Sequence, residues 1–444
     1  MHRIAVLLLT LLTSFAFAAD KPNIIFILAD DLGYGDLGCY GQKRIKTPNI
    51  DKLAEEGMRF TQAYAGSTVC APSRCALMTG KHMGHAHIRG NGKVFLRNED
   101  VTVAKLLKKA GYTTANIGKW GLGDPGTDGV PAKQGFDEFF GYLNHVHAHD
   151  YYPNHLFRHE ERVPLPGNAD GKRGAYTSDL FTQEALNFVE RQKDKPFFLF
   201  LAYTTPHGNN EQIHKGDGMQ VPSDEPYSKE DWPQNEKNFA AMITRMDRDI
   251  GSLMAKLKEL GIDEKTLVIF SSDNGPHAEG HAPKYFQSSG PLRGMKRDLT
   301  EGGIRVPAIA RWPGKIKAGS VSEHVWAFWD FMPTACELAG ITPPQDINGI
   351  SMKNALLGGE QKQHEYLYWE FHERGFTQAV RMGNWKAVRN VHGKPTELYD
   401  LSKDIGEEKN LAAQHPDIVK KAEELFKTAR VDSAEFPIRE PKKK

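Results

Sequence analysis

The strongest constraint on the fold is a set of short apolar runs that each lead into polar residues. Residues 22–29 read Pro-Asn-Ile-Ile-Phe-Ile-Leu-Ala and are followed by Asp30 and Asp31. An uninterrupted run of this length, rich in β-branched residues, predicts a strand that is buried on both faces of a sheet. Similar runs occupy residues 113–117, 196–203 and 266–272, and they lead into Lys119, into His207 and into Asp273 with Asn274.

Helical patterns alternate with these predicted strands. Residues 103–110, 178–192 and 239–260 carry apolar side chains at helical spacing, and Gly111 and Gly261 end two of these segments. Strands that alternate with helices pair in parallel through right-handed crossovers. Ligands of such sheets bind where the carboxyl ends of the strands meet. The sequence therefore predicts an α/β fold with a mostly parallel sheet flanked by helices, and one site formed by the residues that follow its strands.

The last part of the chain has a different pattern. Closely spaced short strands are predicted at residues 365–370, 377–381, 385–389 and 397–400, followed by a helix at residues 416–429. This pattern indicates a smaller α+β domain with an antiparallel sheet packed by a helix. We accordingly divide the chain into a signal peptide (1–19), a catalytic domain (20–362) and a C-terminal subdomain (363–444).

The N-terminus is typical of a secretory signal peptide. A basic start at His2 and Arg3 precedes an apolar run at residues 4–12, and an Ala-x-Ala sequence follows, which predicts cleavage after Ala18 or Ala19. The run is too short to span a bilayer. We therefore expect an exported protein, periplasmic or secreted, with no membrane span. A formal net charge of +1 indicates no nucleic-acid partner.

One segment carries the chemistry. Residues 70–80 read Cys-Ala-Pro-Ser-Arg-Cys-Ala-Leu-Met-Thr-Gly. Pro72 suits the first turn of a helix, because that position needs no amide hydrogen. Cys70 is then expected at the N-terminus of this helix, where free amide groups and the helix dipole favour an anion. We expect this position to stabilise the Cys70 thiolate.

This segment resembles the signature of the type I sulfatases, Cys-x-Pro-Ser-Arg followed by Leu-x-Thr-Gly. The rest of the mature chain agrees with this family of the alkaline phosphatase superfamily. The resemblance implies an alkaline-phosphatase-like fold, an arylsulfatase-like activity on sulfate monoesters, and oxidation of Cys70 to formylglycine by a separate activating enzyme. In the family chemistry, one hydroxyl of the hydrated aldehyde displaces the alcohol from sulfur, and deprotonation of the other lets sulfate leave by elimination.

Two pairs of oxygen-bearing residues indicate a metal site. Asp30 with Asp31 and Asp273 with Asn274 follow two predicted strands. They offer the hard oxygen ligands that Ca²⁺ and Mg²⁺ prefer, and the absence of histidine and thiolate from this set argues against zinc. The oxygen of the modified Cys70 and the sulfate would complete the shell.

The resemblance also implies roles for four basic residues. Arg74 is similar to the arginine that stabilises formylglycine, and Lys119 to the sulfate-contacting lysine of Gly-Lys-Trp. Lys296 and His207 are similar to a pair that neutralises developing charge and protonates the departing alcohol. One position departs from the family pattern. Gly121 stands where many members have a histidine that bonds the aldehyde hydrate.

The substrate is indicated by weaker signals. Residues 145–152 are dense in histidine and aromatic residues. We interpret His147 and His149, together with His277, as a pocket wall that binds a sugar, while a surface loop or a further metal site are alternatives. By analogy with the family we expect a carbohydrate sulfate of the galactose or N-acetylgalactosamine type.

Two other functions remain compatible with the same residues. One is a phosphomonoester or phosphonate hydrolase of the same superfamily, which zinc and a preference for phosphate esters would favour. The other is a non-catalytic protein that binds sulfated glycans. The complete set of catalytic residue types favours an enzyme over such a binding protein.

Overall fold

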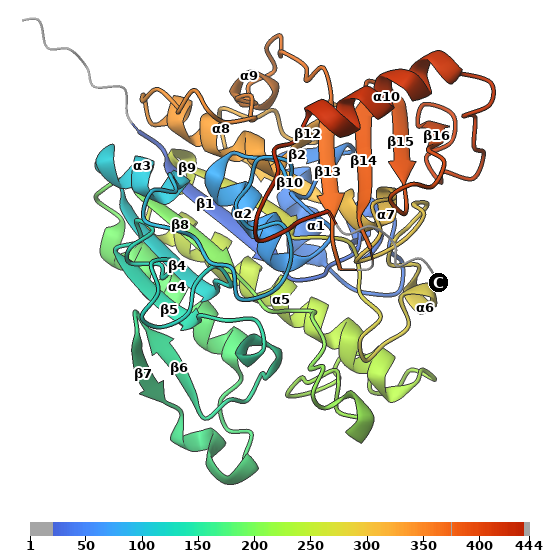
Figure 1. The fold of residues 1–444 in the computed structure, drawn as a ribbon. Coiled ribbons are helices and arrows are strands. Elements are labelled where there is room, and N and C mark those ends of the chain that lie inside the picture. Colours follow the sequence, from blue (N-terminus) through green and yellow to red (C-terminus); the bar gives the residue numbers. More distant parts are fainter. Residues whose placement is uncertain (1–20, 374, 439–444) are drawn as a thin grey trace, which may run out of the picture.

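The computed structural model describes residues 21–373 and 375–438, so the predicted signal peptide (1–19) lies outside the described residues. A large sheet forms the centre of the molecule, and a smaller sheet with one helix lies to its side (Figure 1). No helix in the described ranges is both long enough and apolar enough to cross a membrane.

The large sheet has ten strands in the order β11-β2-β10-β9-β1-β8-β4-β5-β6-β7. Its parallel centre consists of β9 (Thr266–Ser272), β1 (Asn23–Ala29), β8 (Phe197–Ala202), β4 (Thr113–Lys119) and β5 (Glu138–Tyr142). The edges are formed by β10 (Ala308–Arg311), β2 (Met58–Phe60) and β11 (Ser320–Ser322), and by β6 (His155–Arg158) and β7 (Glu161–Pro164). Antiparallel pairing occurs at β9–β10–β2 and at β5–β6–β7. The predicted mostly parallel sheet is confirmed.

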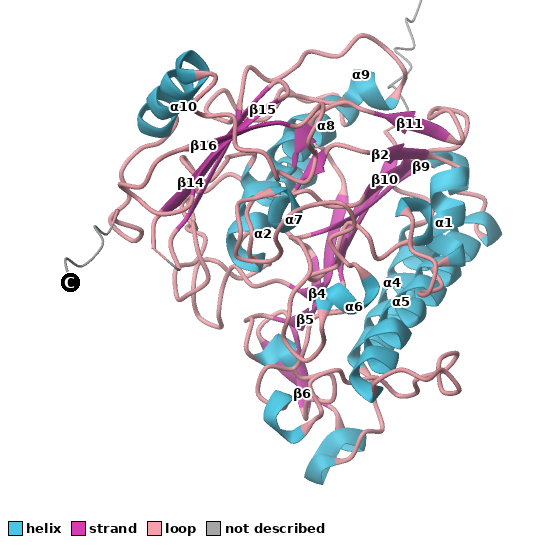
Figure 2. Cartoon of the chain, turned by 90° about the vertical axis from the view of Figure 1, so that its right-hand side faces the viewer, coloured by secondary structure: helices cyan, strands magenta, loops and turns pink. Residues whose placement is uncertain are grey.

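Helices cover both faces of this sheet (Figure 2). One face is covered by α1 (Pro48–Glu55), α4 (Thr177–Gln192) and α5 (Gln234–Glu259), and the other by α2 (Cys70–Thr79), α3 (Val103–Lys109) and α8 (Phe331–Leu338). Side chains of a strand point alternately to opposite faces. In β1, Ile24 and Phe26 therefore enter one core while Ile25 and Ile27 enter the other. This burial on both sides explains why the strand reads as a continuous apolar run.

The smaller sheet is antiparallel, in the order β13 (Leu367–Phe371), β14 (Thr377–Met382), β15 (Trp385–Arg389) and β16 (Glu397–Asp400). Helix α10 (Pro416–Thr428) packs Phe426 against one face of it. The other face carries Trp369 and Val388 into the core of the large sheet. The predicted α+β arrangement is confirmed, and a shared apolar core joins the two sheets.

Short elements complete the fold. They are β3 (Ala63–Tyr64), β12 (Trp326–Ala327), α6 (Pro283–Phe286), α7 (Glu301–Ile304), α9 (Lys353–Leu356) and 3₁₀ turns at Gly38–Tyr40, His147–His149, Pro166–Gly171, Ile213–Lys215, Asp263–Lys265 and Phe328–Asp330.

Candidate active site

The polar residues that follow β1, β8 and β9 lie together at one edge of the large sheet. Backbone hydrogen bonds continue beyond the strand ends, because the amide of Asp30 donates to the carbonyl of Thr205 (3.1 Å) and that of Asp273 to the carbonyl of Ala29 (3.1 Å). These bonds hold the three strand ends in register. The structure brings Asp30, Asp31, Cys70, Arg74, Lys119, His207, Asp273, Asn274 and Lys296 together here, all of them buried.

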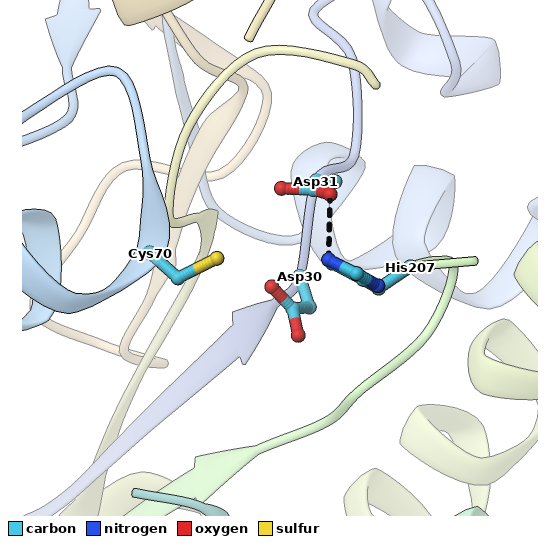
Figure 3. A group of neighbouring side chains, drawn as sticks. All are labelled: Asp30, Asp31, Cys70 and His207. Carbon is cyan, nitrogen blue, oxygen red and sulfur yellow. Dashed lines mark ion pairs between the residues drawn. The ribbon is translucent and has the colours of Figure 1, made fainter. Parts of the chain in front are cut away.

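Asp31 has a left-handed backbone, with φ of 64°. Consecutive side chains of an extended strand would point to opposite faces. The left-handed residue turns the chain at the end of β1, so both carboxylates reach the same site. Asp30, Asp31, Cys70 and His207 each offer a metal-binding atom within 4.8 Å of the others. Figure 3 shows these side chains from three different segments pointing toward one another. The conformation costs about 1 kcal/mol in backbone strain.

Two buried lysines each pair with one of these carboxylates. Nζ of Lys119, at the end of β4, lies 2.7 Å from Oδ2 of Asp30. Nζ of Lys296 lies 2.6 Å from Oδ2 of Asp31. Burial alone would raise the pKa of the Asp30 carboxyl, but Lys119 and the other surrounding positive charges hold this pKa well below its usual range. Asp30 is therefore an anion in this site.

Arg74 joins helix α2 to the strand ends. Its Nε and one terminal nitrogen donate to Oδ2 of Asp273 at 3.0 and 2.8 Å, and the other terminal nitrogen donates to the carbonyl of Lys119 at 2.7 Å. The guanidinium is fully buried. Such a multiply bonded arginine is held in one geometry and can position an anion beside it.

His207 is held in a defined orientation. Its Nδ1 lies 2.7 Å from the carbonyl of Gly208, and its Nε2 lies 3.1 Å from Nζ of Lys296. With Nδ1 donating to the carbonyl, Nε2 accepts from the ammonium. Burial and the charge of Lys296 lower the pKa of His207 well below its usual value. The ring is therefore neutral, and its Nε2 accepts a hydrogen bond from the ammonium group of Lys296.

The oxygen donors of the site fit a divalent cation. Oδ1 of Asp30 and Oδ1 of Asn274 are buried and have no hydrogen-bond partner within the described residues. The side-chain nitrogen of Asn274 donates to Oδ1 of Asp31 (2.6 Å). Because the two atoms of the amide group point in different directions, Oδ1 of Asn274 points away from Asp31. Burial and the neighbouring Asp30 raise the pKa of Asp273 to about 7. A Ca²⁺ or Mg²⁺ ion would offset this crowding of carboxylates and supply the partner that the two oxygens lack.

Cys70 begins helix α2, as the sequence predicts. The expected stabilisation of its thiolate is wrong for the unmodified side chain. Burial raises the pKa of the Cys70 thiol, and this effect outweighs the attraction of Lys119 and Lys296. The thiol at this buried helix terminus is therefore neutral, because the loss of solvation disfavours the thiolate more than the nearby positive charges favour it.

Two of the three candidate substrate histidines lie beside the cluster. The rings of His149 and His277 both stack on His207, with centroid distances of 4.8 and 5.5 Å. Nδ1 of His149 also lies 3.1 Å from the Glu211 carboxylate. His147 differs, because its ring contacts are with Tyr142, His155 and Phe157, away from the charged groups.

Sequence reasoning missed two residues of this region. Glu279 pairs with Arg297 at 2.7 Å and lies within 3.4 Å of Nδ1 of His277. It belongs to a loop without a motif or a strand end, so no signal could have singled it out. His145 lies against Gly121. The departure from the family pattern at Gly121 indicated that either another group or water takes the place of the usual histidine, but not which of them.

The fold and this site define a hydrolytic enzyme of the α/β class with an alkaline-phosphatase-like sheet. Comparison with known families sharpens that class. Residues 22–341 match the family described as Sulfatase, and residues 295–432 match one described as N-sulphoglucosamine sulphohydrolase, C-terminal. The chain belongs to the sulfatase family, and its activity is that of a sulfuric ester hydrolase.

Individual relatives agree with this assignment. The chain is 35% identical to N-acetylgalactosamine-6-sulfatase of Canis lupus familiaris, over 84% of this chain and 72% of the relative. It is 33% identical to arylsulfatase A of Homo sapiens, over 96% of this chain and 91% of the relative. The crystal structure of Ps i-CgsB in complex with k-i-k-neocarrahexaose superposes with a TM-score of 0.78 at 31% identity, covering 92% of each chain.

Proposed function

We propose that this sulfatase is exported and hydrolyses sulfate monoesters of carbohydrates of the galactose or N-acetylgalactosamine type. The observation that carries the proposal is the convergence of Cys70 with Asp30, Asp31 and His207 in one buried cluster. The sugar class is supported by the names of similar proteins, an N-acetylgalactosamine-6-sulfatase and a protein solved with a neocarrahexaose.

Two groups that the chain must acquire complete the site in this proposal. Asp30, Asp31, Asp273 and Asn274 hold Ca²⁺ or Mg²⁺, which as a Lewis acid stabilises charge on sulfate oxygens. Cys70, oxidised to formylglycine by an activating enzyme, would supply a hydrated aldehyde with two hydroxyls. One would serve as the nucleophile, and deprotonation of the other would let sulfate leave.

The remaining residues bind and orient the sulfate. Arg74, fixed by Asp273, stabilises the modified residue 70 from within the same helix. Lys119 contributes positive charge from the end of β4, where its pairing with Asp30 holds the ammonium in place. Both cations act in a water-poor site, where the attraction to a developing negative charge exceeds that in bulk water.

Lys296 and His207 deliver the proton that the departing alcohol needs. Their contact of 3.1 Å places an ammonium donor against a neutral imidazole acceptor. When one member of the pair gives its proton to the leaving oxygen, the other member can supply a proton to replace it. Asp31, at 2.6 Å from Lys296, keeps the lysine charged and in position.

The sugar lies against His149 and His277, the two rings that stack on His207. His147 stays a predicted sugar contact, and its packing against Phe157 makes it the weakest of the three. The chain itself is divided as the sequence indicates, with a signal peptide (1–19), a catalytic domain (20–362) and a C-terminal subdomain (363–444). Export through this signal peptide leads to the periplasm or the exterior.

Mass spectrometry and turnover test this function together. We expect the tryptic peptide Phe60–Arg74 of active enzyme to carry an aldehyde in place of the Cys70 thiol. The same material should release sulfate from galactose or N-acetylgalactosamine sulfates faster than it releases phosphate from the matching phosphate esters. An intact thiol in fully active enzyme contradicts the mechanism. Faster phosphate release by a zinc-loaded protein supports the phosphohydrolase alternative, and affinity without turnover supports a binding protein.

A further inference from the structure

The space beside Gly121 is filled by another residue. Gly121 has a left-handed backbone with φ of 80°, and a Cβ atom on it would lie 2.5 Å from Cε1 of His145 and 3.1 Å from each ring nitrogen. The imidazole of His145 therefore occupies the volume into which a side chain at position 121 would project. A histidine at one of these positions excludes a histidine at the other.

Backbone pairing beyond β4 and β5 brings His145 to this place. The amide of Trp120 donates to the carbonyl of Tyr142 (2.9 Å), and the amide of Gly121 donates to that of Leu143 (3.0 Å). The chain that follows β5 thus runs beside the chain that follows Lys119. His145 reaches the same edge of the sheet as the sulfate-binding lysine, although 26 positions of sequence separate it from Lys119 (145 − 119).

Both ring nitrogens of His145 are buried and lack a hydrogen-bond partner in the described parts of the chain. His149 and His207 differ from it, because His149 pairs with Glu211 and His207 with Gly208 and Lys296. A buried donor and acceptor left without partners destabilise the folded state. Such an unpaired ring at the wall of an active site points to a ligand or a reacting group as its partner.

The charges around His145 favour its neutral form. Burial, followed by the nearby positive charges of Lys119 and Arg74, lowers the pKa of His145 well below its usual value. A neutral imidazole has one nitrogen that donates and one that accepts a proton. The ring is therefore neutral, and the nitrogen that carries no proton is free to accept a hydrogen bond.

We propose that His145 supplies, from the segment after β5, the imidazole that bonds the hydrated aldehyde of residue 70 and accepts its proton. This assignment rests on the proposed function. The O–H bond of the free hydroxyl breaks and its proton passes to the ring nitrogen. The electron pair of that bond forms the carbonyl, and the bond from the same carbon to the sulfate oxygen breaks, with its pair leaving on sulfate. The imidazolium then returns the proton to water.

The first test replaces His145 and follows the chemistry of residue 70. For His145→Ala we expect turnover to fall by about 10²–10³-fold. Because only sulfate release is slowed, we also expect the Phe60–Arg74 peptide, quenched during turnover, to retain sulfate in most molecules. The control is His155→Ala, a ring in β6 that lies tilted against that of His147, with a centroid distance of 4.6 Å. It should keep turnover and peptide mass as in the natural protein. Turnover of His145→Ala within about 3-fold of the natural protein overturns the proposal.

The second test exploits the shared space. Gly121→His alone should lower the melting temperature, because two imidazoles then compete for one volume. In the double variant Gly121→His with His145→Ala, the melting temperature should recover. Turnover should rise at least about 10-fold above that of His145→Ala, because histidine tolerates a left-handed backbone better than most residues. A double variant that is no more active and no more stable than the single variants overturns the proposal.

These outcomes are separable from failure of the proposed function. If the Phe60–Arg74 peptide of active natural enzyme keeps its thiol, the proposed function fails and the role of His145 fails with it. If the aldehyde is present and the natural enzyme turns over, while His145→Ala does so equally well, only the role of His145 fails.

Discussion

Two buried charged clusters connect different parts of this molecule, and they differ in how completely their polar atoms are paired. The first lies at the carboxyl edge of the large sheet, around Asp30, Asp31 and Asp273. Its carboxylates crowd one another, and Oδ1 of Asp30 and Oδ1 of Asn274 have no hydrogen-bond partner in the described ranges, although Oδ1 of Asp30 lies 3.6 Å from a terminal nitrogen of Arg74. In the proposed function, a cation and a substrate complete this cluster.

The second cluster lies between the large body and the small sheet. Lys386 of β15 lies 2.9 Å from Oε1 of Glu301 in α7, while Tyr64 and Arg305 contact its Oε2 at 2.6 and 3.2 Å. The amide of Glu301 donates to Glu407 at 2.7 Å. Lys386 and Glu301 are fully buried. Glu301 is bonded on both carboxylate oxygens, while Oε1 of Glu407 has no hydrogen bond in the described residues and lies 3.6 Å from Nζ of Lys386. This cluster fastens the small sheet to the body.

Burial of charge by itself therefore does not mark a functional site. Both clusters are dry, and both join segments distant in sequence. What distinguishes them is how far the protein alone satisfies the charges: Asp30 and Asn274 each leave an oxygen without a hydrogen bond in the first cluster, whereas the central Glu301 of the second is bonded on both oxygens. Substitutions in the first cluster should therefore act on turnover, and substitutions in the second on stability.

The largest separation of the two effects is expected at Cys70. Cys70→Ala should abolish turnover, by about 10⁵-fold or more, since no other group can form the aldehyde. The melting temperature should stay within a few degrees of that of the natural protein. Sulfate release and thermal unfolding on the same sample measure both. Cys75→Ala in the same buried helix is the matched control, and it should retain turnover. Equal losses in both variants would contradict the assignment.

Lys386 should show the opposite behaviour. Lys386→Met leaves Glu301 as a buried charge with a missing partner, and the free energy of unfolding should fall by about 3–5 kcal/mol. Turnover per folded molecule should change by less than about 3-fold, because Lys386 pairs with the second cluster and not with the first. Denaturant unfolding and active-site titration give the two numbers.

The control for that experiment is Lys394→Met, which alters an exposed lysine of the same subdomain. Its unfolding free energy should remain within about 0.5 kcal/mol of that of the natural protein. A loss of turnover per folded Lys386→Met molecule comparable to that of Cys70→Ala would break the distinction between the clusters.

Removal of the divalent cation should affect only the first cluster. Chelation should lower turnover by about 10²-fold or more and lower the melting temperature, because the carboxylates lose their compensating charge. Added Ca²⁺ or Mg²⁺ should restore both. The Lys386→Met variant should show the same cation-dependent shift from its lower starting temperature. Insensitivity of turnover to chelation would refute the metal assignment.

The smallest effect is expected from the titration of Glu407. Burial and the nearby Glu301 raise the pKa of Glu407 to about 7, despite the attraction of Lys386. The folded state then keeps a proton that the unfolded state loses at lower pH. Its contribution to stability is complete below the unfolded pKa and is lost as pH rises to about 7, at about 1 kcal/mol per pH unit.

Glu407→Gln should make the decline of stability with pH shallower by the contribution of Glu407 and leave that of Asp273, whereas Glu408→Gln, at an exposed neighbour, should leave the whole decline in place. Free energies of unfolding measured at several pH values between about 4.5 and 7.5 would show the difference in pH dependence between the two variants. Identical pH profiles for the two variants would mean that another group titrates.

Much of the first cluster was accessible from the sequence because its residues follow strands with a strong pattern. The apolar runs before Asp30, His207 and Asp273 are long and uninterrupted, and parallel strands must end at a common edge. The segment at Cys70 carries its own signature. The roles of these residues stay predictions, but their proximity followed from topology. The second cluster was not predicted, because Glu301, Lys386 and Glu407 lie in segments with no motif.

The sequence by itself thus determined the α/β class, the antiparallel C-terminal unit, the family and the group of residues that meets at the sheet edge. Local pattern suffices for these, since burial of apolar side chains sets the periods of strands and helices. Only the tertiary structure decided that Asp31 turns left-handed, that Cys70 keeps its proton in a dry helix terminus, and that His145 fills the space beside Gly121. These features depend on which atoms lie nearby in space and on how much water remains, and neither quantity is carried by sequence spacing.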